Sequence, residues 1–120
     1  MRVLVVDDNV EIREILTKML AFLGYKTNGA KDSFEAIRIL ENDHYDVVIT
    51  DGEMPKMTGF ELARFIKKKY PHIFIVGLSG SPECEKFKFA GADVYFNKPV
   101  DLPKLHMAIK NKKLRVTTNT

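Results

Sequence analysis

The chain has 120 residues, of which 45% are hydrophobic and 29% charged, with a formal net charge of +3. This length suits one compact domain with a real core, and the modest charge comes with no motif for reading nucleic acid. No apolar run approaches the roughly 20 residues of a membrane-spanning helix, and the start of the chain lacks a secretory signal. We therefore expect a cytoplasmic domain that binds neither membranes nor nucleic acid directly.

Short apolar segments alternate with amphipathic ones along the whole chain. We expect strands at residues 2–6, 25–28, 47–50, 73–78 and 93–96 and helices after the capping residues Asn9, Asp32, Thr58, Ser81 and Asp101. Such alternation predicts an α/β fold with helices on both faces of a parallel sheet. For five strands and five helices, the common arrangement is the flavodoxin-like, doubly wound sheet with strand order 2-1-3-4-5.

Polar residues stand where four of these strands end. The first strand is followed by Asp7 and Asp8, the third by Asp51, the fourth by Ser79, and the fifth leads to Lys98. In the order 2-1-3-4-5 the strands concerned are neighbours, so their carboxyl ends lie at one edge of the sheet. We therefore expect these five side chains to form one pocket.

The charges of this pocket indicate phosphoryl chemistry. Three carboxylates and one ammonium leave a formal charge of −2, which a divalent cation would balance. Oxygen ligands favour Mg²⁺ over zinc. A carboxylate beside Mg²⁺, a lysine and a hydroxyl can attack phosphorus and form an acyl phosphate. Asp51, at the centre of the predicted sheet, is the best candidate for the nucleophile.

Four motifs in this order resemble the receiver domain of two-component response regulators. They are VLVVDDN at 3–9, VVITDGEMPKMTG at 47–59, LSG at 78–80 and GADVYFNKP at 91–99. The resemblance covers residues 2–111, nearly the whole chain. Each motif alone is a weak signal, but all four at these spacings are very specific.

The resemblance implies a role for each residue of the predicted pocket. Asp51 would be the phosphoacceptor, with Asp51, Lys98 and Ser79 as the catalytic group. Asp8, Asp51 and the backbone carbonyl of Glu53 would bind Mg²⁺ directly, and Asp7 would bind it through water.

The resemblance also implies roles around the pocket. Ser79 and Tyr95 would be the switch residues: on phosphorylation Ser79 would move to hydrogen-bond the phosphoryl group and Tyr95 would turn inward. Glu53 and Ser81 would tune the rate of dephosphorylation, although the sequence leaves open whether Glu53 reaches the metal or repels an incoming anion. The peptide bond before Pro99 would be cis.

The implied function is a signalling switch phosphorylated by a sensor histidine kinase or a phosphotransfer protein. The domain would catalyse its own phosphorylation and dephosphorylation without turning over an external substrate, as a monomer or weak dimer with an unknown downstream target. One alternative is a receiver-like interaction module that is never phosphorylated. Another is a phosphohydrolase with an aspartate nucleophile, for which Glu53 would be the second acid.

Two features of the chain are unusual beside the common pattern of the family. Gly52 and Gly80 leave little side chain at the rim of the pocket, which predicts easy access for phosphodonors. Ser79 and Gly91 lie closer together than usual, so we expect a short or irregular fourth helix. In this family the fourth helix, the fifth strand and the fifth helix form the usual dimer face, so we doubt that the common dimer forms.

We place the receiver domain at residues 1–112 and a disordered tail, or the start of a linker, at residues 113–120.

Overall fold

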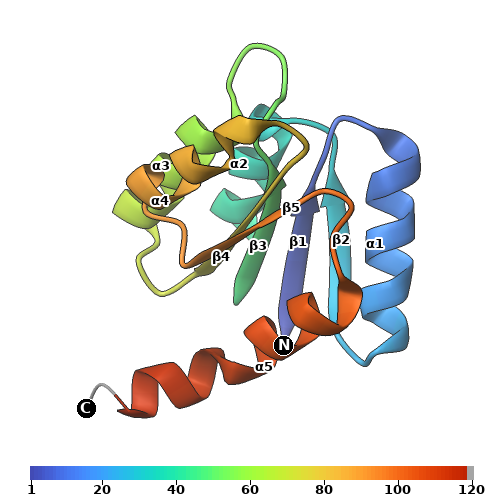
Figure 1. Cartoon of the computed structure of the whole chain (residues 1–120), viewed down its shortest axis with the longest axis vertical. Helices are drawn as coiled ribbons and strands as arrows, with labels where there is room; N and C mark the ends of the chain where they lie inside the picture. The colour runs from blue at the N-terminus through green and yellow to red at the C-terminus, as the bar shows by residue number, and fades with distance from the viewer. Residues whose placement is uncertain (119–120) are drawn as a thin grey trace.

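The computed structural model describes the backbone of residues 1–118 and the side chains of residues 1–112. Within residues 1–118, five parallel strands form one sheet in the order β2-β1-β3-β4-β5 (Figure 1). The strands are β1 (Arg2–Val6), β2 (Lys26–Ala30), β3 (Val47–Asp51), β4 (Phe74–Ser79) and β5 (Val94–Asn97). The helices are α1 (Val10–Phe22), α2 (Ser33–Asn42), α3 (Gly59–Lys69), the 3₁₀ turn η1 (Pro82–Glu85), α4 (Lys86–Ala90) and α5 (Leu102–Thr118). The predicted doubly wound, flavodoxin-like fold is confirmed.

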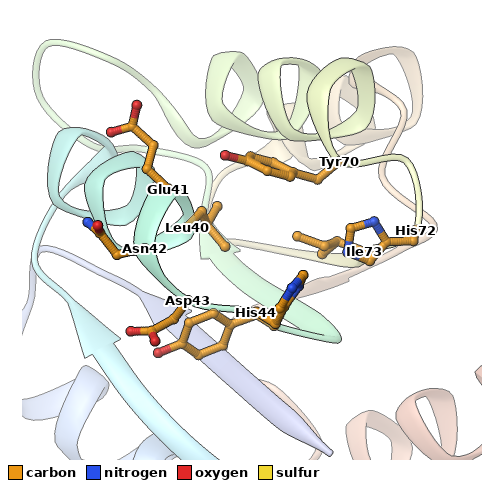
Figure 2. Close-up of a pocket in the computed structure, with 9 residues that line it drawn as sticks. Leu40, Glu41, Asn42, Asp43, His44, Tyr70, His72 and Ile73 are labelled. Atoms are coloured by element: carbon orange, nitrogen blue, oxygen red, sulfur yellow. The ribbon is translucent and has the colours of Figure 1, made fainter.

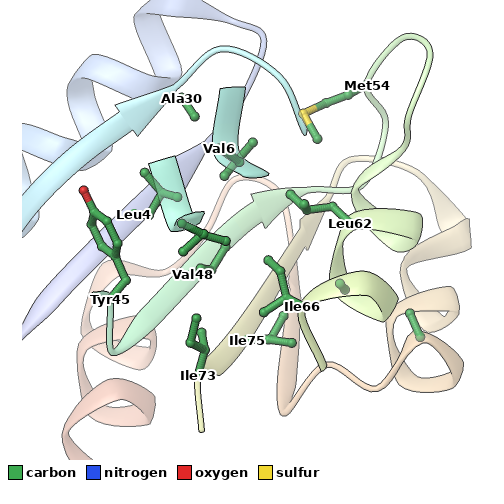
Figure 3. Close-up of a cluster of buried hydrophobic side chains, with 14 of the residues drawn as sticks. Leu4, Val6, Ala30, Tyr45, Val48, Met54, Leu62, Ile66, Ile73 and Ile75 are labelled. Carbon is green, nitrogen blue, oxygen red and sulfur yellow. The ribbon is translucent and has the colours of Figure 1, made fainter. Parts of the chain in front are cut away.

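Hydrophobic side chains cover both faces of the sheet. On one face Leu4 and Val6 of β1 join a buried cluster with residues of α2, α3 and α4 (Figure 3). On the other face Val3 and Val5 join a second cluster with residues of α1 and α5. Successive strand residues point to opposite faces, so a strand buried on both sides is apolar at every position. This explains why the strands ahead of the candidate site are continuous apolar runs.

Capping side chains mark where the helices on the two faces of the sheet begin. Asn9 accepts a hydrogen bond from a backbone N–H of α1, and Asp32 does the same for α2. Thr58 and Glu61 form the predicted reciprocal capping box at the start of α3. Each cap lies in a loop that follows a strand, so the caps help to set the shape of the loops that carry the site.

The fourth helical segment is short, as the spacing of Ser79 and Gly91 predicts. The chain makes a four-residue 3₁₀ turn, η1, and then a five-residue helix, α4. Gly91 ends α4 with a φ of 93°, a conformation that favours glycine. Whether this face forms dimers remains a prediction.

The end of the chain continues the last helix. The backbone of α5 stays helical past residue 112, where we expect the domain to end, and residues 119–120 of the predicted tail lie outside the described residues. The division between domain and tail remains a prediction. Among the described residues, no helix has the length and apolar character needed to cross a bilayer.

Packing around Gly77 gives a test of the fold. A Cβ at Gly77 would lie 2.3 Å from Cγ of Phe87, a ring that is fully buried. We expect Gly77→Ala to lower the free energy of unfolding by about 1–3 kcal/mol, because overpacking forces neighbouring groups to shift. Gly80→Ala is the matched control, since a Cβ there meets no atom within 4 Å. Chemical denaturation of both variants measures the difference, and equal effects would contradict this packing.

Candidate functional site

The predicted site residues lie at the carboxyl ends of neighbouring strands. Asp7 directly follows β1, Asp51 is the last residue of β3, and Ser79 is the last residue of β4. Lys98 directly follows β5. Because β3 lies between β1 and β4 in the sheet, Asp51 occupies the centre of this edge.

Three acidic side chains converge at this edge. Asp7, Asp8 and Asp51 each offer a carboxylate oxygen, and these oxygens lie within 4.8 Å of one another. Asp7 and Asp51 are buried, whereas Asp8 is exposed. The structure thus brings together the three acids that the sequence predicts.

Lys98 provides the positive charge of the site. Its Nζ donates a hydrogen bond to Oδ2 of Asp7 at 3.1 Å and lies 3.3 Å from Oδ1 of Asp51. Removing either partner of such a buried pair leaves an uncompensated charge. Lys98 has two carboxylate partners, Asp7 as well as Asp51. One ammonium therefore ties together the ends of β1, β3 and β5.

Burial and neighbouring charges change the acidity of this site. Burial raises the pKa of Asp51 from 3.8 to about 6; the charge of Lys98 opposes this rise and that of Asp7 adds to it. Burial alone would lower the pKa of Lys98, but its hydrogen bond to Asp7 and the charge of Asp51 raise it. The ionised form of Asp51 is thus less stable here than in water, and a further positive charge would favour it, as in sites that bind cations.

The donor set fits a hard divalent cation. Both oxygens of Asp7 already have protein partners, because Oδ1 accepts the Asn9 N–H at 2.9 Å and Oδ2 accepts Lys98. The exposed Asp8 and the central Asp51 are therefore more available as direct ligands than Asp7. Three carboxylates and one lysine sum to −2, and carboxylate oxygens suit Mg²⁺. The acidic cluster could bind such a metal.

Ser79 is engaged by the loop after β3. Its Oγ donates to Oε2 of Glu53 at 2.6 Å, and Ser81 Oγ donates to the same oxygen at 3.1 Å. The Glu53 side chain is therefore directed to Ser79 and Ser81, an outcome that neither sequence alternative anticipated. The spacing of Glu53 and Ser81 after their strands places both at the site, but it carries no information on side-chain direction.

The remaining site residues lie around this centre. Tyr95 is half-buried against the cluster under α2, α3 and α4, and its inward turn on activation remains a prediction. The peptide bond between Lys98 and Pro99 is cis, as the resemblance implies.

Gly52 does not leave the open space at the rim of the pocket that we expect from the sequence, because aromatic rings pack against it. The residue is buried, and a Cβ there would lie 2.7 Å from Cζ of Phe60 and 3.1 Å from Cε2 of Phe87. Glycine at this position makes room for two aromatic rings whose centroids are 4.6 Å apart. A larger residue at Gly52 would displace Phe60. A change in phosphorylation rate in such a variant would therefore not report on access to the site alone. Of the two rim glycines, Gly80 is the one with open space, because a Cβ there would meet no atom within 4 Å.

A cavity of about 230 Å³ lies away from these residues (Figure 2). It is lined by the end of α2 and by the residues just before β3 and β4, among them Tyr45, Tyr70 and Ile73. This is the amino-end edge of the sheet, opposite to Asp51. The cavity therefore has no part in the chemistry of the acidic cluster.

Together, the fold and the site define a flavodoxin-like α/β domain with a carboxylate–lysine centre at the carboxyl ends of its strands. The family model for the response regulator receiver domain matches residues 3–110. The chain belongs to this family, which is a family of signalling domains and not of enzymes that turn over a substrate.

Relatives include a sensor protein and response regulators. The chain is 33% identical over 111 residues to the sensor protein EvgS of Escherichia coli, covering 88% of this chain and 9% of that protein. It is 35% identical over 107 residues to the response regulator MprA of a Mycobacterium species, covering 87% of this chain and 46% of that protein. The chain thus spans about a tenth of the length of one relative and about half of the other.

Solved receiver domains share the whole fold. The receiver domain protein from Clostridium thermocellum superposes with a TM-score of 0.88 at 35% identity, covering 99% of this chain and 98% of that one. The response regulator TrrA of Thermotoga maritima, solved in complex with Mg²⁺-BeF, superposes with a TM-score of 0.84 at 35% identity, covering 92% of this chain and 96% of that one.

The acidity of Asp51 predicts a pH-dependent gain in stability for Asp51→Asn. The pKa of Asp51 lies above its ordinary value in the folded state, so folding binds a proton between pH 4 and 6 and wild-type stability falls as the pH rises through that range. Without divalent cations at pH 7.5, we expect Asp51→Asn to raise the free energy of unfolding by about 1–3 kcal/mol. The gain should shrink as the pH falls from 6 to 4.

Urea denaturation of both proteins at several pH values, in the presence of a chelator, measures this gain. A gain that is constant from pH 4 to 7.5 would show that Asp51 keeps its ordinary acidity in the folded protein.

Proposed function

We propose that this chain is a phosphorylation-dependent signalling switch in which Asp51 accepts a phosphoryl group. The observation that carries the proposal is the position of Asp51: it is buried at the central strand end, beside two further acids and 3.3 Å from Lys98. A structural acid has no need of two like-charged neighbours, whereas a phosphoacceptor that binds a cation does.

The chemistry follows from these groups. The phosphoryl donor is the phosphohistidine of a sensor histidine kinase or of a phosphotransfer protein. A carboxylate oxygen of Asp51 attacks phosphorus, the P–N bond breaks, and its electron pair stays on the imidazole of the donor. Lys98, already held between Asp7 and Asp51, places its ammonium where it can neutralise the oxygens of the transferred group.

A divalent cation completes the site, and we assign it as Mg²⁺. Asp8, Asp51 and the backbone carbonyl of Glu53 would hold it directly, and Asp7 would hold it through water. When bound, the ion supplies positive charge against the phosphoryl oxygens. The donor set of carboxylates supports this assignment, as does the complex of TrrA with Mg²⁺-BeF.

The acyl phosphate then changes which partners the domain binds. Ser79 moves to donate to the phosphoryl group and Tyr95 turns inward, which shifts a two-state equilibrium. Glu53 and Ser81 tune how long the acyl phosphate survives. The domain acts in the cytoplasm as a monomer or weak dimer and binds neither nucleic acid nor membranes directly.

Incubation with acetyl phosphate and Mg²⁺, followed by intact mass measurement, tests the proposal. We expect one phosphoryl group on the wild type and none on Asp51→Asn, which keeps the shape of the side chain but cannot form the acyl phosphate. A chelator should abolish the addition. A wild type that gains no phosphoryl group would favour a receiver-like interaction module that works without phosphorylation.

A further inference from the structure

The carboxylate of Glu53 accepts three hydrogen bonds from the last residue of β4 and from the loop that follows it. Oε2 accepts the hydroxyls of Ser79 at 2.6 Å and Ser81 at 3.1 Å, and Oε1 accepts the Gly80 N–H at 3.3 Å. The Ser79 contact is short, as is typical when a hydroxyl donates to a charged carboxylate. Two consecutive loops of the site are therefore joined by one acidic side chain.

The hydroxyl of Ser79 can serve only one acceptor. A serine hydroxyl carries a single hydrogen, and here that hydrogen is donated to Glu53. Under the proposed function, the same hydrogen would be donated to a phosphoryl oxygen on Asp51. Both acceptors are anionic oxygens that compete for this one hydrogen. The two hydrogen bonds therefore exclude each other.

We propose that Glu53 is a positioning residue that holds Ser79 in the unphosphorylated arrangement and competes with the phosphoryl group for its hydroxyl. This inference rests on the proposed function and goes beyond a role of Glu53 in dephosphorylation. In the unphosphorylated domain the Glu53 carboxylate accepts the hydrogen bond of Ser79. After phosphorylation, the phosphoryl group on Asp51 accepts it instead.

The burial of the partners shows how the contact can open. Ser79 is fully buried and anchored in β4, whereas Glu53 is exposed on its loop. The carboxylate can therefore turn into solvent without disrupting the core, and water then satisfies its oxygens. Release of Glu53 requires no rearrangement of the sheet.

The same contact reaches the short fourth helical segment. Ser81 is the N-cap of η1, with its Oγ accepting the Glu83 N–H at 3.1 Å while it donates to Glu53. Its Oγ also lies 3.1 Å from that of Ser79. When Glu53 turns away, the Ser81 hydroxyl that caps η1 loses the acceptor of its own hydrogen. The contact of Glu53 therefore extends to the N-cap of η1.

Binding of beryllofluoride, a mimic of the phosphoryl group on Asp51, tests the competition. The apparent affinity for BeF₃⁻ with saturating Mg²⁺ is measured by ¹H–¹⁵N NMR titration of wild type, Glu53→Gln, Ser79→Ala and the double variant. We expect Glu53→Gln to bind on the order of tenfold more tightly than wild type, the size of one charge-assisted hydrogen bond. In the Ser79→Ala background, the same substitution should change the affinity by less than about twofold.

The design separates competition from simple charge repulsion. Glu83→Gln is the matched control, because it removes one negative charge from the neighbouring turn η1 while the Glu83 side chain pairs with Lys86 and not with Ser79. We expect this control to leave the affinity within about twofold of wild type. An equal gain from Glu53→Gln with and without Ser79, or from Glu83→Gln, would show repulsion and overturn the proposal.

Failure of the Glu53 competition and failure of the proposed phosphorylation of Asp51 give different results. If the wild type accepts phosphate from acetyl phosphate while Glu53→Gln binds BeF₃⁻ no more tightly, the switch stands and the competition is wrong. If the wild type neither accepts phosphate nor binds BeF₃⁻, the proposed function fails, and the role of Glu53 fails with it.

Discussion

One ammonium group at the end of β5 makes the rest of the site possible. Lys98 lies within 3.3 Å of carboxylate oxygens from both Asp7 and Asp51, which are buried at the ends of β1 and β3. Without it, two acids would face each other in a poorly hydrated place, which is strongly unfavourable. The lysine offsets only part of that penalty, because the pKa of Asp51 remains raised to about 6. The remaining charge imbalance is what a cation and a phosphoryl group can use.

The sequence predicts the fold and the acidic centre well because both depend on position along the chain. Apolar runs that end on polar residues identify parallel strands, and the strand order then brings Asp7, Asp51 and Lys98 to one edge without knowledge of any side-chain conformation. The shortness of α4 follows in the same way from the spacing of Ser79 and Gly91.

Side-chain direction is where sequence reasoning stops. Nothing in the spacing distinguishes a Glu53 that faces a metal from one that accepts the hydroxyls of Ser79 and Ser81. The role of Gly52 is hidden for a related reason, since the rings that need its space come from Phe60 and from Phe87 on α4, and the latter is 35 residues away along the chain. Such contacts depend on how helices pack, which a single sequence does not specify.

We propose that Asp51, and no other residue of this crowded edge, carries the phosphoryl group. Reduction with borohydride converts an aspartyl phosphate to homoserine, which tandem mass spectrometry can locate after treatment with acetyl phosphate and Mg²⁺. We predict homoserine at position 51 alone. Homoserine at position 7 or 8, or a phosphate that resists reduction and maps to Ser79, would show that Asp51 is not the phosphoacceptor.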